Sequence, residues 1–418
     1  MKILVIGSGA REHAIVWSLA RDASVTELHA APGNPGIAEH AVLHECDIAI
    51  PSEIADLASE LLVDLVVIGP ELPLVAGAAD AVRARGIACF GPSALAARIE
   101  GSKAFAKEIM IAAGVPTARS RTCQTLGEVG RALDEFGAPF VVKDDGLAAG
   151  KGVVVTSDRE VALAHAAGCR NVVVEEFLDG PEISLFGITD GETVLTMEPA
   201  QDFKRVGDGD TGGNTGGMGA YSPLPWAPTD LVERVRREVL QPTIDEMRRR
   251  DTPFVGLLYA GIALTTTGLK VIEFNARFGD PETQVLLSRL RTPLAGVLYS
   301  AAIGSLKDEH ALNFSSDAAV SVVIASCGYP DDIRTGDEIS GLMDATALGA
   351  VVFQAGTRIE GERLHSAGGR VLSVTGVGEN LAAARKIAYL GVDAIVLAGS
   401  IHRHDIAAVA AENSTSRG

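Results

Sequence analysis

The chain has 418 residues, of which 47% are hydrophobic, so it is long enough to form three or four units with cores of their own. Its 36 lysines and arginines against 54 aspartates and glutamates give a net charge of -18, which argues against sequence-independent binding to nucleic acid or to an anionic membrane surface. No apolar run approaches the ~20 residues of a membrane span. The five scattered cysteines lack metal-ligand spacing and are typical of small core residues in a reducing compartment, so we expect a cytoplasmic protein.

Residues 1–99 alternate buried-type strands with amphipathic helices, which predicts a doubly wound parallel sheet covered on both faces. In such sheets, ligands bind beyond the carboxyl ends of the strands. Three unusual loops fall there, and we expect them to form one site. The expected strands are Ile3–Ile6, Leu65–Ile68 and Ile87–Phe90, and the expected helices lie near Ala14–Ala20 and Ala76–Arg85. The three loops are Gly7–His13, Pro32–Gly36 and Gly69–Leu74.

The first loop begins like a dinucleotide-binding motif, but Glu12 stands where G-x-G-x-x-G needs its third glycine. The second strand ends in Ala30 and Ala31 instead of an acid for a ribose hydroxyl, which argues against nicotinamide binding. A glycine turn at a helix N-terminus can instead hold a monophosphate through backbone N–H groups. A plain tight turn would account for the glycines but not for Arg11, Glu12 and His13.

A helix over Ser102–Ala113 carries Lys103, and residues 118–186 then form a compact unit that is bounded by Gly and Pro and looks able to move. Lys143 ends a strand of this unit beside the glycine-rich turn Asp144–Gly152. Several nucleotide-binding folds hold phosphates with such a lysine. The turn is no P-loop, because the first glycine of that motif would fall on Asp145 and its hydroxyl residue on Gly152. The other elements expected in the unit are strands at 152–156 and 171–176 and a helix at 158–167.

Residues 187–310, joined by 100–117, indicate a larger body with a helix over Leu231–Arg250. Between Gln201 and Tyr221 this body is predicted to carry a long structureless loop, and such loops are usually functional or disordered. Its acids suit an ammonium group and its bases suit phosphates. Residues 311–418 form a last unit, with strands expected at 319–326, 351–354 and 370–374 and a disordered tail from Ala411.

Val271–Gln284 begins as a strand and continues into a dense run of polar residues. Strand alternation predicts that Val271, Glu273 and Asn275 share one face. A carboxylate and an amide carbonyl two residues apart suit Mg²⁺ or Mn²⁺, and Arg277 on the same face suits a phosphate or carboxylate. For Glu273 and Asn275 alone, an edge strand with a solvated polar face is the simpler interpretation, but the polar residues that follow favour a site.

Taken together, Asp144–Gly152, Gly212–Tyr221 and Val271–Gln284 resemble the phosphoribosylamine-glycine ligase family of the ATP-grasp ligases, and the likeness extends to about Arg370. The resemblance implies an α/β ATP-grasp ligase that joins glycine to 5-phosphoribosylamine in the second step of de novo purine biosynthesis. ATP would become ADP and phosphate through a glycyl phosphate, with Mg²⁺ or Mn²⁺ as cofactor, in a monomer or weak dimer. The implied parts are an acceptor-binding N-terminal domain at 1–99, an ATP-grasp body at 100–117 and 187–310, a lid at 118–186 and a C-terminal domain at 311–418.

The family pattern also implies the site residues, which fall into four groups. The catalytic group is Lys143, Asp202 and Arg277, and the metal ligands are Glu273 and Asn275. ATP would be bound by Lys103, Lys143, Gly146, Gly150, Lys151, Gly152, Glu175, Glu176, Phe177, Leu178 and Glu182. Phosphoribosylamine and glycine would be bound by Gly9, Arg11, Glu12, Asn34, Gly36, Glu71, Asp202, Lys204, Asp210 and Arg277. The sequence departs from the usual His at Phe203 and the usual Pro at Gly213.

Two other functions stay open at this point. A related ATP-grasp enzyme, such as a biotin-dependent carboxylase subunit or a formate-using purine enzyme, would share the metal strand but lack the Gly212–Tyr221 loop. A nucleotide-sensing binding protein without turnover would need no site for an acyl acceptor. The combination of Glu273 and Asn275 with Arg277 argues against that second alternative.

Overall fold

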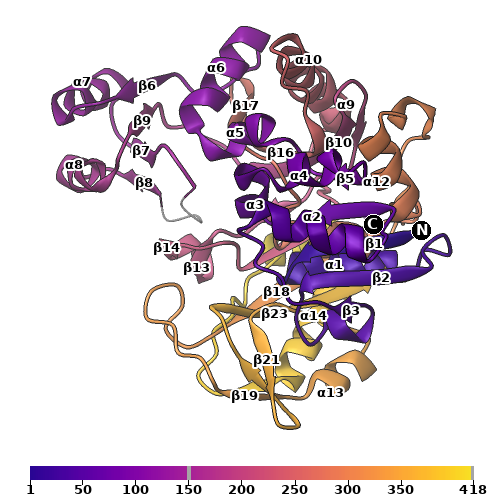
Figure 1. The fold of residues 1–418 in the computed structure, drawn as a ribbon. Coiled ribbons are helices and arrows are strands. Elements are labelled where there is room, and N and C mark those ends of the chain that lie inside the picture. The colour runs from indigo at the N-terminus through magenta and orange to yellow at the C-terminus, as the bar shows by residue number, and fades with distance from the viewer. Residues whose placement is uncertain (148–151, 416–418) are drawn as a thin grey trace.

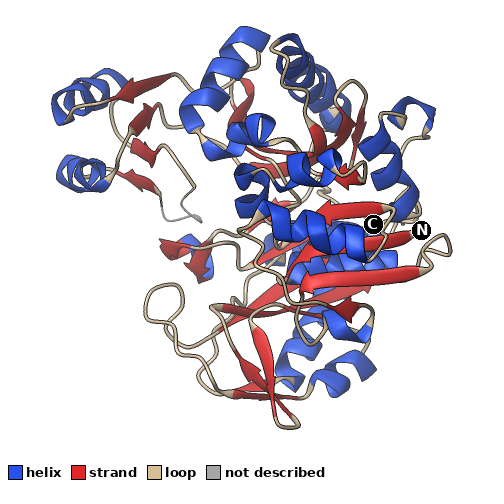
Figure 2. Ribbon diagram, in the orientation of Figure 1, coloured by secondary structure: helices blue, strands red, loops and turns tan. Residues whose placement is uncertain are grey.

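The computed structural model describes residues 1–147 and 152–415 and shows a mixed α/β fold with a parallel N-terminal sheet and several antiparallel ones (Figures 1 and 2). The predicted fold class is confirmed in this respect. Within the described ranges, no helix is both long enough and apolar enough to cross a lipid bilayer.

The N-terminal sheet is parallel throughout, in the order β3-β2-β1-β4-β5. The strand order reverses between β1 and β4, and this is where doubly wound sheets place ligands. The predicted helix near Ala76–Arg85 is confirmed as α4 (Ala78–Ala84), which begins later than expected because Gly77, with a left-handed φ of 95°, separates it from α3. The elements are β1 (Lys2–Gly7), β2 (Glu27–Pro32), β3 (Val42–Leu43), β4 (Leu65–Ile68), β5 (Ala88–Phe90), α1 (Ala10–Leu19), α2 (Pro51–Glu60), α3 (Glu71–Ala76) and α4 (Ala78–Ala84).

A small antiparallel sheet, in the order β6-β9-β7-β8, stands apart at the upper left of Figure 1. Two helices pack on it and close a core of its own that includes Leu133, Val142, Ala162 and Val174. The first strand and first helix of this unit were not expected from the sequence. The elements are β6 (Ser120–Cys123), α7 (Leu126–Phe136), β7 (Phe140–Asp144), β8 (Val153–Thr156), α8 (Arg159–Gly168) and β9 (Val172–Glu175).

The central body is built on an antiparallel sheet in the order β11-β10-β16-β17. The predicted helix over Leu231–Arg250 is confirmed as a helical run with a π-helical turn at Arg236–Leu240, shortly before Pro242. The elements are α5 (Ala94–Gly101), α6 (Lys103–Ala113), β10 (Glu182–Asp190), β11 (Val194–Thr196), α9 (Leu231–Val235), α10 (Gln241–Arg249), β16 (Val255–Thr265), β17 (Gly268–Asn275), α11 (Glu282–Arg289) and α12 (Leu294–Ile303).

The C-terminal part contains two sheets, one of which also takes in strands from the 201–221 segment. That sheet has the order β12-β15-β18-β23-β20, and β13 pairs with β14 in a separate hairpin. The prediction of a structureless loop over Gln201–Tyr221 is therefore wrong. The elements are β12 (Gln201–Asp202), β13 (Arg205–Gly207), β14 (Thr211–Asn214), β15 (Gly219–Ser222), β18 (Ala318–Ala325), β20 (Val351–Gln354) and β23 (Arg370–Gly378).

The second C-terminal sheet has the order β21-β22-β19-β24, while helix α14, with α13 and α15 beside it, packs on β18 and β23 of the first. The predicted disorder from Ala411 is wrong as far as the structure describes the tail, because the last helix continues to Thr415. The elements are β19 (Glu338–Ser340), α13 (Leu342–Ala347), β21 (Thr357–Glu360), β22 (Arg363–Ser366), α14 (Leu381–Ala394), β24 (Val396–Leu397) and α15 (Ala408–Thr415).

The strand β17 contains a register shift that changes which of its residues face the same way. Gly261 of β16 pairs with Glu273, but the next residue, Ile262, pairs with Val271, so Ile272 is an extra residue in the ladder. Such a bulge re-aims side chains. Val271 consequently lies in the core, whereas Ile272 and Glu273 face a cavity. The prediction that Val271 shares a face with Glu273 is therefore wrong.

Helix α1 contacts the C-terminal sheet through a buried histidine. His13 accepts a hydrogen bond at Nδ1 from the backbone N–H of Gln354, 2.8 Å away, and its ring meets the edge of Phe353. Burial, with His40 nearby, lowers the pKa of His13 to about 3. The neutral ring is thus the form that packs between the N-terminal and C-terminal sheets.

We expect this histidine to make the protein less stable in mild acid. Unfolding returns its pKa to about 6.5, so the unfolded chain binds a proton that the folded chain rejects between about pH 6.5 and pH 3. From pH 7 to pH 5 the free energy of unfolding should fall by about 2 kcal/mol through His13. Urea denaturation of the wild type and of His13→Asn, which keeps an acceptor near the same place, measures this. Equal pH slopes for the two proteins would contradict the assignment.

Candidate functional site

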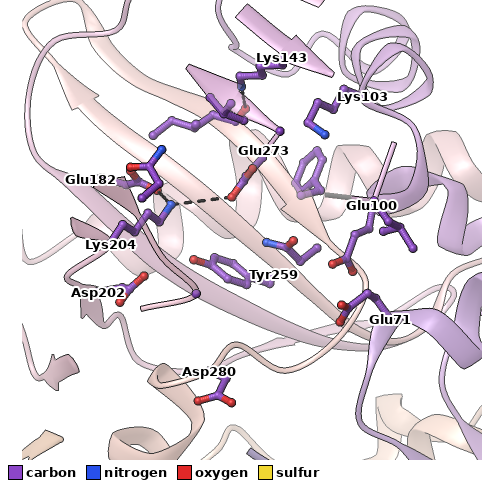
Figure 3. A pocket seen from close by; sticks show the side chains of 18 of the residues that line it. Glu71, Glu100, Lys103, Lys143, Glu182, Asp202, Lys204, Tyr259, Glu273 and Asp280 are labelled. Atoms are coloured by element: carbon purple, nitrogen blue, oxygen red, sulfur yellow. Dashed lines mark hydrogen bonds and ion pairs between the residues drawn. The ribbon is translucent and has the colours of Figure 1, made fainter. Parts of the chain in front are cut away.

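A cavity of about 1030 Å³ is lined by residues of the N-terminal sheet and its loops, the small sheet unit, the central body and the C-terminal part (Figure 3). Its walls come from the loop after β1, the start of α6, strand β7, the connection from β9 to β10, the segment 201–216, strand β17 and the start of β23. Most of the predicted site residues line it, although they are far apart in sequence. The glycine-rich turn borders it through Gly146 and Gly152, whereas Gly150 and Lys151 lie outside the described residues.

One wall of the cavity carries lysines that are held by a buried carboxylate. Lys143 on β7 lies 2.9 Å from Glu175 and donates a hydrogen bond to the carbonyl of Ile272. Lys107 on α6 lies 3.1 Å from the other oxygen of Glu175. Lys103 donates to the carbonyl of Gly146, and burial lowers its pKa despite the attraction of Glu273. This lysine wall, formed by Lys103, Lys107 and Lys143, provides cationic groups suited to phosphate oxygens.

The opposite side of the same space is acidic and is bridged by Lys204. Its ammonium group pairs with Glu182 and lies 3.7 Å from Oε1 of Glu273 (Figure 3). Burial opposes charge on Lys204, but Glu182, Tyr259 and Glu273 outweigh it and raise its pKa. Burial likewise opposes charge on Glu273, and Lys204 with Lys143 and Lys103 lowers its pKa below the usual value. Both side chains are thus charged at neutral pH.

Asp202 lies deeper on this side and is poorly compensated. Its Oδ1 is buried without a hydrogen-bond partner, and burial together with nearby Glu282 raises its pKa well above the ordinary value. Glu282 is itself buried, accepting a hydrogen bond from Ser184, whose hydroxyl also contacts Tyr259. A cationic ligand next to Asp202 would favour its carboxylate form.

The segment after strand β17 meets the N-terminal loops through Arg277. The guanidinium lies 3.2 Å from Glu71 at the start of α3 and 3.2 Å from Glu100 on α5. Burial opposes the charge, but these two carboxylates raise the pKa of Arg277 above its usual value. Glu100 also accepts a hydrogen bond from the backbone N–H of Ala276, which fixes the chain beside Arg277. Arg277 therefore connects Glu71 to the β17 strand.

The first N-terminal loop is occupied by its own side chains. The backbone N–H of Gly9 donates to Oε2 of Glu12, and Nε of Arg11 donates to Oε1 of the same carboxylate. A Cβ at Gly7 or Gly69 would come within 2.5 Å and 2.1 Å of Glu12 atoms, so glycine is required at both positions for the buried carboxylate to fit. Gly9, Arg11 and Glu12 border the cavity together with Glu71.

Three of the predicted substrate residues have other partners. Asn34 does not border the cavity and donates to the carbonyls of Ser8 and Gln354, and a Cβ at Gly36 would collide with His13. Asp210 borders the cavity but pairs with Arg403 at 2.7 Å. Asn34 and Gly36 thus hold the loop after β2 in place.

The predicted adenine connection, from Glu175 to Leu178, borders the cavity. The Glu176 side chain turns away to Arg119 and Lys270, and although burial opposes it, these two partners lower the pKa of Glu176 to about 2. Phe177 is 46% exposed. An exposed aromatic ring beside the lysine wall is suited to contact with a purine base.

Glu273 and Asn275 fit the predicted metal ion. Both border the cavity, both offer hard oxygen donors, and a cation, the ammonium of Lys204, already lies beside Glu273. Among residues 1–147 and 152–415, no group of three or more His, Cys, Asp or Glu side chains forms a metal cage. Mg²⁺ needs no such cage, because it keeps waters and shares phosphate oxygens.

Models of three domains of phosphoribosylglycinamide synthetase match the chain in succession. The N domain matches residues 1–100, the ATP-grasp (A) domain 101–283 and the C domain 319–409. The chain belongs to the phosphoribosylglycinamide synthetase family. The resemblance predicted from the three motifs is therefore confirmed.

Curated relatives and solved structures agree with this membership. A phosphoribosylamine–glycine ligase of Streptomyces coelicolor is 64% identical over 414 residues, covering 98% of this chain and all of the relative. A ligase of the same name from Mycobacterium leprae is 53% identical over 421 residues, covering 99% of each. The crystal structure of the Thermotoga maritima phosphoribosylamine–glycine ligase is similar with a TM-score of 0.85 and 30% identity, over 97% of this chain and 100% of that one.

Several cavity residues of this synthetase-family chain were missed by sequence reasoning. Arg370 at the start of β23 pairs with Asp280 at 3.1 Å and donates to the carbonyl of Gly216. Glu100, Lys107 and Glu282 make the contacts given above. Asp280 and Glu282 lie within the polar run Val271–Gln284, so their place in the sequence could have identified them as site residues. Glu100 and Lys107 look like ordinary helix charges until the fold brings them to the cavity.

The Glu175 carboxylate should be the main structural support of the lysine wall. Replacing it in Glu175→Gln leaves two buried ammonium groups without their counter-charge and should lower the free energy of unfolding by about 3–5 kcal/mol. Glu135 on α7 pairs with Arg121 at the protein surface, where the two side chains are 40% and 60% exposed, so Glu135→Gln should cost no more than about 1 kcal/mol. Chemical denaturation of both variants provides the comparison. Similar losses in the two would show that Glu175 has no special role.

Proposed function

We propose that this chain joins glycine to 5-phosphoribosylamine, with ATP converted to ADP and phosphate, as the second step of de novo purine biosynthesis. The observation that carries the proposal is one cavity bordered by a lysine wall, by the donors Glu273 and Asn275, by an underpaired acid at Asp202 and by the N-terminal loops. Near-complete coverage by relatives that bear this activity in their names supports it.

In the proposed reaction, a carboxylate oxygen of glycine attacks the γ-phosphorus of ATP, and the bond to the ADP oxygen breaks. The amine nitrogen of phosphoribosylamine then attacks the carbonyl carbon of glycyl phosphate, and phosphate leaves as the amide forms. The chain supplies position and charge and no covalent intermediate. The amine loses a proton in the second step, and the carboxylate form of Asp202 is suited to accept it or to hold the glycine ammonium.

The residues divide between the substrates by their place in the cavity. Lys103, Lys143 and Arg277 would face the triphosphate and the transferring phosphoryl group. Glu273 and Asn275 would hold Mg²⁺ or Mn²⁺, which neutralises phosphate charge when bound. The segment 175–178, Gly146, Gly152 and Glu182 would contact the rest of the nucleotide. We propose also that residues 118–186, which have their own core, act as a lid over it.

The acceptor would lie against the N-terminal loops. Its phosphate would take contacts from Gly9 and Arg11, and its ribose hydroxyls from Glu71, in place of the internal partners that these groups have in the structure. Glycine would lie between this acceptor and ATP, near Asp202 and Lys204. The two substrate sites would thus meet at Arg277, which pairs with Glu71.

Purified protein with ATP, Mg²⁺, glycine and freshly generated phosphoribosylamine tests the function. ADP and glycinamide ribonucleotide should form in equal amounts, and leaving out glycine or the amine should stop both. Bicarbonate and formate in place of glycine are the controls for related ATP-grasp reactions. ADP formation with either of these, and none with glycine, would contradict the proposal.

Glu273→Gln should depress kcat by roughly a hundredfold or more, because it keeps the shape of a metal ligand but removes its charge. The melting temperature should hardly change, since Glu273 is not part of the hydrophobic core. Glu160→Gln, on an exposed part of α8, is the matched control and should behave like the wild type. Near-normal turnover by Glu273→Gln would exclude it as a ligand.

The division of residues between the two sites predicts opposite effects from two sets of variants. Arg11→Ala or Glu71→Ala should raise the KM for phosphoribosylamine by roughly ten- to a hundredfold and leave the ATP affinity unchanged. Lys143→Ala should do the reverse. Steady-state kinetics with each substrate varied, together with nucleotide titration, measures both. If Arg11→Ala abolishes ATP binding and spares the acceptor, the N-terminal unit is the nucleotide site instead.

A further inference from the structure

The β13–β14 hairpin, residues 205–214, forms a wall of the cavity but has little means of holding itself in place. Arg205, Asp210 and Asn214 border the cavity. The hairpin contains four glycines, and its residues from 208 to 213 are exposed. Hydrophobic burial therefore contributes little to its position. In Figure 1 the hairpin lies between the lid and the C-terminal part of the chain.

The polar contacts that hold the hairpin turn come from three residues near the C-terminus, Arg403, His404 and Asp405, which we call the C-terminal clamp. Arg403 lies 2.7 Å from the Asp210 carboxylate, and Asp405 accepts a hydrogen bond of 2.8 Å from the backbone N–H of Gly209. The backbone N–H of His404 donates to Asp208, also at 2.8 Å. Three consecutive residues of the turn are thus held by three consecutive residues of the clamp.

Arg403 is the centre of this arrangement and is only 1% exposed. Its Nε and Nη2 donate to the two oxygens of Asp405 at 2.7 and 2.6 Å, which fixes the plane of the guanidinium. A buried arginine is stable only when its donors are satisfied. Here Asp405, Asp210 and the backbone carbonyl of Arg205 satisfy them.

The guanidinium of Arg403 also holds both neighbours of Lys204. On one side it lies over the ring of Phe203, 4.8 Å from the ring centroid, and on the other it donates to the carbonyl of Arg205 at 3.2 Å. The carbonyl of Lys204 itself accepts hydrogen bonds from Thr215. Lys204 is therefore anchored on each side along the backbone, with its ammonium group directed to Glu182 and Glu273.

We propose that Arg403 is a positioning residue that holds the segment from Asp202 to Asp210 against the cavity and so places Lys204 and Asp202 for the reaction. Phe203 has a role in this arrangement as the surface on which the guanidinium lies. The inference rests on the proposed function only in naming glycine as the substrate bound beside Lys204 and Asp202.

Hydrogen exchange and kinetics of full-length Arg403→Ala test the proposal together. Amide exchange in residues 205–214 should become faster by about tenfold or more, while exchange in β7 and β9 stays as in the wild type. The kcat/KM for glycine should fall by roughly ten- to a hundredfold, with the KM for ATP within about twofold of the wild type. Arg403→Lys keeps the charge but not the planar fork, so it should recover only part of the loss.

Two further variants guard against misinterpretation. Asp405→Asn, outside the cavity lining, keeps the buried arginine but weakens both the grip on its fork and the bond from Gly209, so it should shift both measurements in the same direction if Arg403→Ala fails to fold. Arg334→Ala removes another arginine of the C-terminal part, which bonds Asp337 and the carbonyl of Ala398, and should change neither.

Unchanged exchange in the hairpin would overturn the proposal. So would faster exchange with wild-type glycine kinetics, or equal losses for glycine and ATP, which would indicate general destabilisation. Absence of ligation by the wild type would contradict the proposed function separately, and the exchange measurement would still decide whether Arg403 holds the hairpin.

Discussion

Charge compensation in a partly enclosed space is the constraint on which the site depends. Lys143 is held by Glu175 and Lys204 by Glu182, in each case across different elements of the fold. Removing such groups from water is unfavourable unless each has a partner. The pairs therefore do two things. They let cations and anions gather at one place without unfolding it, and they keep each side chain at a defined position before any substrate arrives.

Asp202 differs from these pairs because one of its carboxylate oxygens has no hydrogen-bond partner. That oxygen is buried, and Glu282 and Glu182 lie near the carboxyl group as well as Lys204 and Arg370. The neighbouring Lys204 is already paired with Glu182, so a ligand with an ammonium group gains most by binding at this position. An anionic ligand gains most at the lysine wall, where phosphate oxygens can accept hydrogen bonds from Lys103 and Lys143. The cavity thus offers different positions to positively and negatively charged ligand groups, independently of their shape.

The sequence predicted the elements whose signals are local. Alternating strands and helices identified the parallel N-terminal sheet, and three polar motifs identified the family, whose implied site residues mostly line the cavity. The failures have long-range causes. The bulge at Ile272 depends on pairing with β16, and the strand β15, on which β12 pairs, depends on β18 as its partner. Helix charges such as Lys107 became site residues only through tertiary contacts, which periodicity cannot show.

The pairing of β15 with β18 has a consequence for how the chain can be divided. The backbone of Gly219–Ser222 completes its hydrogen bonds with a strand that begins about a hundred residues later, at Ala318. A fragment that ended before β18 would expose that row of N–H and C=O groups on a bare sheet edge. Such edges recruit strands from other chains, so this fragment produced alone would tend to self-associate. The C-terminal sheet thus protects the solubility of the segment that carries Asp202 and Lys204.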